Sequence, residues 1–132
     1  MADISERIAN YVSETDIVNP VLSAEFDFEG KRNISFHVRT SAFTGTATAD
    51  IEIETSNIGG DDLDEDASWK ELLPFSTISA PGAFPLTEFL TLIDDGTKKT
   101  PGAKGRVSLT LAGTSPDFSA EIYMGYDVGV TE

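Results

Sequence analysis

The side chains in this 132-residue chain that are best suited to chemistry are one histidine and a set of acids. His37 is the only histidine. A Ser-His-Asp arrangement would require it to be buried beside a carboxylate and near a serine. The alternation of polar and apolar residues instead places His37 on a polar strand face with Ser35 and Arg39. The sequence therefore predicts a surface histidine rather than a catalytic one.

An acidic run at residues 61 to 66 is the candidate for a metal site. Every second residue from Asp62 to Asp66 matches the first three acidic positions of a calcium loop. The glycine that should follow is Ala67, and Leu73 occupies the twelfth position, where a carboxylate is required. The EF-hand pattern fails, so a solvated acidic loop is the preferred interpretation and a looser calcium site is the alternative.

Two aromatic residues could bind a sugar by stacking against its ring. Trp69, the only tryptophan, could form a sugar-binding platform with Tyr123 on one face of a sheet. A core anchor is the preferred interpretation of Trp69. The chain has 23 acidic residues, but no spacing selects a pair for glycoside hydrolysis. We therefore predict no catalytic residue, no cofactor and no bound metal, and a non-enzymatic protein.

The composition limits the partners that the protein can have. Its net charge of −14 repels nucleic-acid phosphate, so no direct nucleic-acid role is expected. There is no cysteine, which excludes disulfides and thiolate chemistry. No apolar run approaches the length of a membrane span, and residues 1 to 18 lack the pattern of a secretory signal. We expect no membrane partner.

The hydropathy pattern predicts the strands that would position these residues. In residues 46 to 55, Ala and Ile alternate with Thr, Asp and Glu, which is typical of a strand with one buried and one solvated face. Turn signals separate similar strands at intervals of roughly ten residues, and helix signals are few. This pattern predicts an all-β protein, an antiparallel β-sandwich with jelly-roll or Greek-key connections.

Three segments complete this prediction of the sandwich. Residues 29 to 32 are expected to form the turn of a hairpin, and residues 113 to 117 a second hairpin turn. Residues 86 to 93 fit both periodicities, and we favour a strand or a short turn of helix. The sandwich itself is assigned to residues 20 to 132 as a single domain.

The segment from residue 1 to 19 is predicted to be an arm outside this domain. Residues 3 to 12 have the spacing of a short amphipathic helix, and Asn19-Pro20 ends it. A helix of about ten residues is marginal in water, so the arm needs a surface to dock on. Its candidate partner-binding residues are Ile4, Ile8, Tyr11 and Val12.

Two segments resemble parts of small β-sandwich proteins of tailed bacteriophages. The first runs from Thr44 to Asn57 and continues through Gly59-Gly60 to Trp69. The second runs from Gly105 to Phe118 and looks like the closing hairpin of those proteins. The resemblance covers residues 44 to 128. The chain departs from the pattern by a longer acidic insert before Trp69 and by a Lys-rich loop before Arg106.

The resemblance implies a structural protein of the virion, of the capsid decoration or cement type, assembled in the host cytoplasm. Its partners would be the major capsid protein or another virion protein, and it would form a homo-oligomer such as a trimer. The departures leave open which position in the particle the protein occupies. The residues themselves also support an alternative function, a carbohydrate-binding β-sandwich module.

Overall fold

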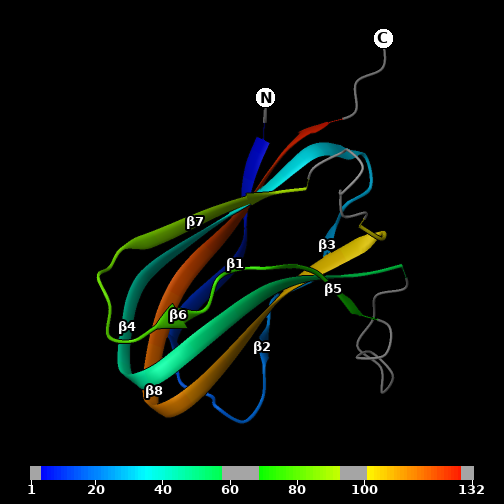
Figure 1. The fold of residues 1–132 in the computed structure, drawn as a ribbon. Coiled ribbons are helices and arrows are strands. Elements are labelled where there is room, and N and C mark those ends of the chain that lie inside the picture. The colour runs from blue at the N-terminus through cyan, green and yellow to red at the C-terminus, as the bar shows by residue number, and fades with distance from the viewer. Residues whose placement is uncertain (1–3, 58–68, 93–100, 129–132) are drawn as a thin grey trace.

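The structure is a computed structural model that describes residues 4–57, 69–92 and 101–128. These residues form an all-β, antiparallel fold, and none of them is helical. Figure 1 shows the strands, which are β1 (Ile4–Glu14), β2 (Val21–Leu22), β3 (Phe26–Asp27), β4 (Lys31–Ser56), β5 (Lys70–Pro74), β6 (Ile78–Ser79), β7 (Leu86–Thr91) and β8 (Lys104–Val128).

Strands β4 and β8 organise the fold because each of them runs through both layers. They pair antiparallel along almost their whole length. The pairing shifts register at Gly45, which has a φ of 104°, and a Cβ there would collide with the carbonyl oxygen of Ser115. On β8, Gly113 has a φ of 113°. Because glycine tolerates both conditions, the two strands bend together at this corner (Figure 1).

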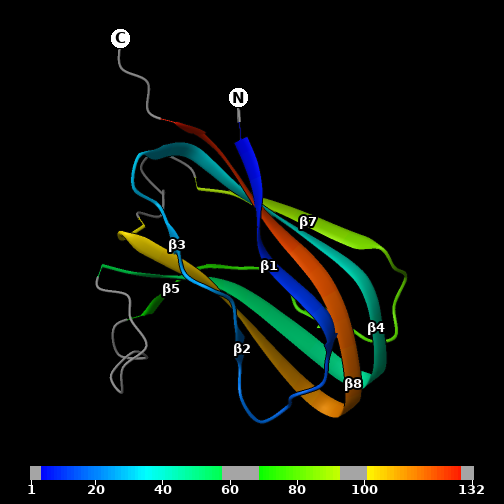
Figure 2. The same ribbon diagram turned by 180° about the vertical axis from the view of Figure 1, so that it is seen from behind.

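The bend divides the strands into two sheets. In the first sheet, β1 pairs with the second half of β8, which pairs with the first half of β4, which pairs with β7. In the second sheet, β2 and β3 pair with the first half of β8, and β5 and β6 pair with the second half of β4. Figure 2 shows the two layers from behind. This alternation between sheets is the connectivity of a jelly roll, so the predicted all-β sandwich is confirmed.

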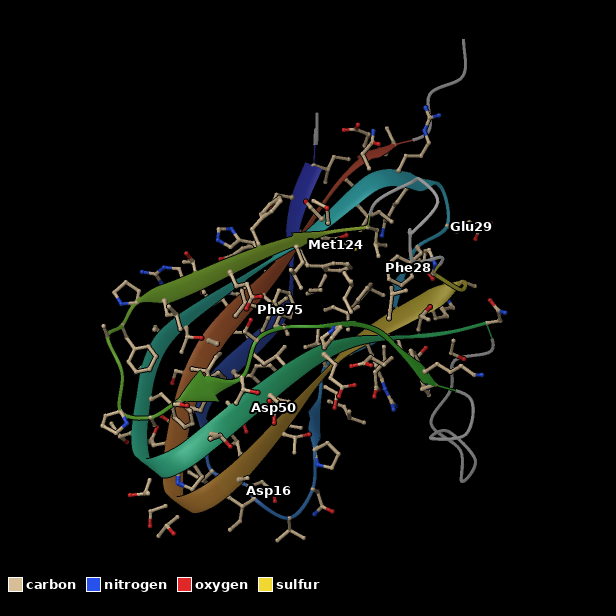
Figure 3. All side chains as sticks on the ribbon, viewed as in Figure 1. Asp16, Phe28, Glu29, Asp50, Phe75 and Met124 are labelled. Atoms are coloured by element: carbon tan, nitrogen blue, oxygen red, sulfur yellow. The ribbon has the colours of Figure 1, made fainter. Side chains whose placement is uncertain are left out.

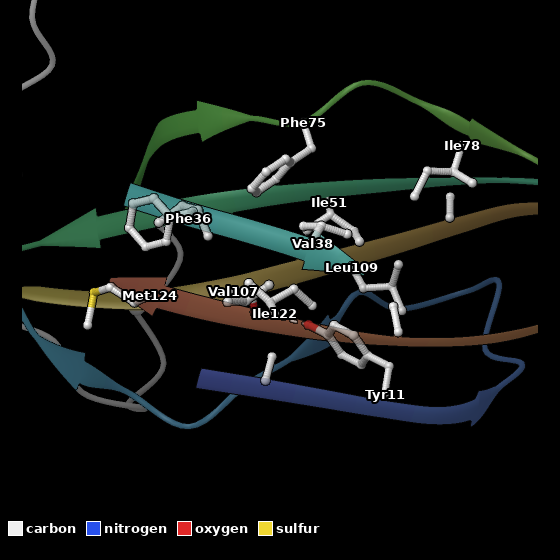
Figure 4. Packing of buried hydrophobic residues seen from close by; sticks show 14 of the residues in the cluster. Tyr11, Phe36, Val38, Ile51, Phe75, Ile78, Val107, Leu109, Ile122 and Met124 are labelled. Carbon is white, nitrogen blue, oxygen red and sulfur yellow. Dashed lines mark hydrogen bonds between the residues drawn. The ribbon is translucent and has the colours of Figure 1, made fainter. Parts of the chain in front are cut away.

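The side chains between the sheets form one hydrophobic cluster. Both halves of β4 and of β8 contribute to it. Every second residue of each half is apolar, and the bend directs these residues of both halves into the space between the sheets. Phe36 and Ile51 come from the two halves of β4, and Leu109 and Ile122 from those of β8; all four are fully buried (Figure 4). Each such side chain stabilises the fold by roughly 1.5–3 kcal/mol.

The predicted N-terminal helix is wrong, because residues 4–14 are a strand of the first sheet. β1 pairs with β8 from Ile4 opposite Tyr126 to Glu14 opposite Phe118. Two register shifts interrupt this ladder, so the buried positions do not follow a strict alternation and the apolar residues imitate helical spacing. Tyr11 is buried in the core cluster, and this segment is therefore not an arm outside the domain.

The Tyr11 hydroxyl also ties the first sheet to the second. Its Oη donates to the carbonyl oxygen of Val21 at 3.0 Å. Burial, reinforced by the nearby Glu14, raises the pKa of Tyr11 well above its usual value. The hydroxyl therefore stays protonated and remains a donor.

Both predicted hairpin turns are also wrong in detail. β3 pairs with β8 in the second sheet, whereas β4 begins in the first sheet, so residues 29 to 32 connect two layers rather than two paired strands. Residues 113 to 117 lie inside β8 and form its bend. A glycine with positive φ serves a corner as well as a reversal, and the sequence signal does not separate the two. Residues 86–91 form the strand β7, which is one of the two forms expected for residues 86 to 93.

Candidate binding groove

A row of three aromatic rings crosses the outer face of the first sheet. His37 of β4 is paired with Phe89 of β7 on one side and with Tyr123 of β8 on the other. Paired residues on neighbouring strands point to the same face of a sheet, so the three rings are neighbours. The His37 and Phe89 ring centroids are 5.9 Å apart in an edge-to-face arrangement. We call Phe89, His37 and Tyr123 the aromatic row.

The next row of the same face carries small residues. Ser35 of β4 is paired with Gly125 of β8, which is paired with Ser5 of β1. Small side chains beside large rings leave a hollow, which we call the groove. It has a volume of about 280 Å³ and is lined by Ile4, Ser5, Ser35, His37, Phe89, Tyr123 and Gly125.

The aromatic row is open to solvent and supported by polar contacts. Phe89 is 59% exposed, an unusual position for a phenylalanine. The Tyr123 hydroxyl donates to Glu121 Oε1 at 3.2 Å, and the Arg7 guanidinium donates to Glu121 Oε2 at 3.2 Å. One carboxylate therefore holds both Tyr123, which lines the groove, and Arg7 of β1, which is paired with Tyr123; we call these three side chains the rim. This arrangement of rings, hydroxyls and fixed charges is suited to binding a small polar molecule.

His37 lies where the sequence placed it, exposed on the outer face of its strand. Within the part of the chain that the structure describes, no hydrogen bond joins it to a serine or a carboxylate. Its contact is the ring of Phe89. The geometry therefore gives His37 a place in the aromatic row rather than in a catalytic triad.

The platform of Trp69 and Tyr123, which was the alternative to a core anchor, is not formed. Trp69 lies against Arg106 on the outer side of the second sheet, with the guanidinium carbon 4.4 Å from the centroid of the indole ring. Tyr123 belongs to the opposite outer face. Trp69 is only 6% exposed, as an anchor should be, but it lies outside the hydrophobic cluster between the sheets. It covers a buried ion pair, in which Arg106 Nε donates to Glu54 Oε1 at 2.6 Å.

The four predicted partner-binding residues do not share one surface. Tyr11 is buried in the core, and Ile8 is partly buried against it. Ile4 lines the groove, whereas Val12 is 65% exposed further along β1. A helix would have gathered all four side chains on one face, but a bulged strand distributes them. Of the four, Val12 is the one left as a candidate for docking outside the groove.

Carboxylates line the outer face of the second sheet. Asp50, Glu52 and Glu54 alternate with buried residues on β4, and Glu71 lies on the neighbouring β5 (Figure 3 labels Asp50). Burial and the nearby Glu71 raise the pKa of Glu52. Among the described residues no group of acids, histidines or cysteines has the arrangement of a metal site. The acidic run at residues 61 to 66 lies outside those residues.

Sequence reasoning missed Phe89, Ser35 and Gly125 as parts of a site. Alternation alone correctly put His37 and Tyr123 on solvated faces, but it does not reveal which strands are neighbours. Phe89 fell in the segment that fitted both a helix and a strand. Its role is visible only once β7 is paired with β4.

Comparison with known proteins adds little to this geometry. No protein-family model matches the chain, and no curated protein matches it. Among solved structures, one described as "Crystal structure of PirA" is similar over 96% of this chain and 96% of that chain, at 15% identity and a TM-score of 0.43. A likeness at this level carries no argument about function. No helix in the described part of the chain is long and apolar enough to cross a membrane.

Proposed function

We propose that this protein is a non-enzymatic structural component of a tailed-bacteriophage virion, of the capsid decoration type. The resemblance of two of its segments to small β-sandwich proteins of such phages is the origin of this proposal. An all-β sandwich with a strongly acidic surface is compatible with it.

The observation that carries the proposal is the pairing of those two segments. Residues 44 to 57 and residues 105 to 118 are distant in the sequence but form one antiparallel ladder, from Thr44 opposite Asp117 to Thr55 opposite Gly105. They include the corner at which both long strands bend. Each segment alone has a pattern that is common in β-hairpins. Because the two segments pair, the resemblance concerns one continuous structural unit.

The attachment surface that fits this role is an exposed apolar loop between β1 and β2. Ile17 is 49% exposed and Val18 82% exposed, and Val12 precedes them at the end of β1. Asp16 shapes this loop, since its Oδ1 accepts hydrogen bonds from the backbone N–H groups of Val18 at 2.8 Å and Asn19 at 3.0 Å (Figure 3 labels Asp16). These bonds lower the pKa of Asp16. We call residues 12 to 18 the docking segment.

The partner would be the major capsid protein or another virion protein. Burying a large apolar side chain contributes roughly 1.5–3 kcal/mol, so Ile17 and Val18 alone give a weak attachment once ordering costs are subtracted. Several copies acting together would make it strong, which is why we propose a symmetric homo-oligomer such as a trimer. Sedimentation equilibrium of the purified protein measures this assembly directly.

The test is co-sedimentation of purified protein with phage particles. The variant Ile17→Ser/Val18→Ser removes two exposed apolar side chains of the loop between β1 and β2 without touching the core. The matched control, Val128→Ser, makes the same kind of change at another exposed position, 46% exposed at the end of β8. We expect the control to bind at wild-type occupancy and the double variant to lose most of its occupancy. Wild-type occupancy of the double variant would show that the docking segment is not the anchor.

A further inference from the structure

The groove on the first sheet has a composition that the attachment role does not explain. An exposed phenylalanine, a histidine and a tyrosine lie beside two serines and a glycine, while the apolar docking segment lies elsewhere on the molecule. We propose that this groove binds a pyranose sugar. This site is independent of the virion role and does not involve Trp69.

The aromatic row supplies the apolar half of the recognition. One face of a pyranose ring consists mainly of C–H groups, which pack against the face of an aromatic ring, whose quadrupole is negative there. Tyr123 and Phe89 flank His37 across three adjacent strands, and His37 meets Phe89 edge to face, so a sugar would stack on one ring with the others beside it. The exposure of Phe89 means that a ligand would remove apolar surface from water, which favours binding.

The rim and the floor supply the polar half. The hydroxyls of Ser5 and Ser35 lie in the lining, where each can donate and accept a hydrogen bond. At the rim, Glu121 holds both the Arg7 guanidinium and the Tyr123 hydroxyl at 3.2 Å. A sugar hydroxyl also donates and accepts, so this mixture of groups is complementary to it. Because the rim groups are already fixed by each other, little ordering is required when the ligand binds.

The size of the groove limits the ligand to about one ring. Its volume of about 280 Å³ lies just below the range of roughly 300–1,000 Å³ that is typical of sites for drug-sized molecules. Gly125 sets the depth, since its neighbours Met124 and Tyr126 face the core and any side chain at this position would point into the groove. The remainder of a longer glycan would stay in solvent. We therefore expect weak binding of a monosaccharide, with a Kd of about a millimolar.

The test is a nuclear magnetic resonance titration of the full chain with four separate sugars: glucose, galactose, N-acetylglucosamine and glucuronic acid. We expect at least one of them to shift the resonances of Ser35, His37, Phe89 and Tyr123 in a saturable way. Saturable shifts confined to Trp69 and its neighbours would overturn the proposal. No saturable shift with any of the four at concentrations about tenfold above the expected Kd would also overturn it.

Two variants test the groove by different means, and a third controls for the fold. Tyr123→Ala removes a ring, and Gly125→Val fills the floor while leaving every ring in place. Each should weaken binding at least about tenfold, which corresponds to about 1.4 kcal/mol. Thr87→Ala lies on the same strand and face as Phe89 but outside the lining, and should leave the affinity unchanged. If Gly125→Val folds normally and binds the sugar like the wild type, the groove is not the site.

Discussion

The two outer faces of the sandwich are built on the same two strands, and they treat their aromatic residues in opposite ways. On the first sheet, Phe89 stands 59% exposed beside a hollow floor. On the second sheet, Trp69 is 6% exposed and covers the ion pair of Arg106 with Glu54. The largest aromatic residue of a chain therefore need not be its binding residue. What covers the ring, and what the ring covers, decides its role.

The ion pair explains why the second face needs a cover. The Arg106 side chain is only 7% exposed, and a buried charge is tolerated only when it is paired and hydrogen-bonded. Glu54 supplies the pair, and the face of the Trp69 ring adds a cation–π contact. On the first face the described ion pair of Arg7 with Glu121 is 50% and 32% exposed and needs no cover, so the rings of the aromatic row can contact a ligand.

The largest effect on the stability of the fold is expected at Trp69. Trp69→Ala should lower the free energy of unfolding by about 3–5 kcal/mol, because it leaves a cavity and exposes the ion pair. Phe89→Ala on the other face should change it by no more than about 0.5 kcal/mol, as at an ordinary surface position. Urea denaturation of both variants measures the difference. Equal losses would mean that the two faces are not distinct.

A somewhat smaller effect is expected at the arginine. Arg106→Ala should cost about 3 kcal/mol, at the lower end for a broken buried pair, because the remaining Glu54 side chain is 19% exposed and can be partly hydrated. Arg39→Ala removes the same charge from an exposed position of the first face and serves as the control. Chemical denaturation at low and high salt measures both. A loss at Arg39 as large as at Arg106 would contradict the distinction between the faces.

The smallest effect concerns the carboxylates of the second face. Burial, with Glu71 and Glu54 nearby, raises the pKa of Glu52 above its ordinary value of 4.5. The folded state therefore binds this proton more tightly than the unfolded state, so ionisation of Glu52 costs stability at pH above the folded pKa. Glu52→Gln should raise the melting temperature at pH 7, and the gain should vanish as the pH falls below 4.5.

The control for this prediction is Glu29→Gln, which removes one negative charge at an exposed turn away from the cluster. It measures the general benefit of reducing a net charge of −14. A gain of the same size in Glu29→Gln would assign the effect to overall charge rather than to the crowding around Glu52.

Local pattern was sufficient to predict much of the sandwich. The alternation in residues 46 to 55 correctly assigned Ile51 and Ile53 to the buried face and Glu52 to the outer face. It could not predict that β4 continues from residue 31 to 56, because the corner at Gly45 has the composition of a turn. The bulges in β1 interrupt the alternation of polar and apolar residues that indicates a strand, so the spacing of residues 3 to 12 predicted a helix.

The candidate site was less accessible to prediction than the fold. His37 and Tyr123 were correctly assigned to solvated faces, but they are 86 residues apart in the sequence, and only the ladder between β4 and β8 makes them neighbours. Trp69 is the only tryptophan, but the Arg106 side chain that it contacts lies more than thirty residues further along the chain. Local pattern therefore could not predict this contact. Which strands pair depends on the whole fold. The local pattern of a single sequence therefore does not predict which residues become neighbours across strands.

The most direct test of the proposed function is quantitative mass spectrometry of purified phage particles from the source of this chain. The proposal predicts that the protein is present at many copies per particle and in a fixed ratio to the major capsid protein. Washing should leave that ratio unchanged. Absence of the protein from washed particles, with its full amount recovered in the soluble fraction of the lysate, would contradict it.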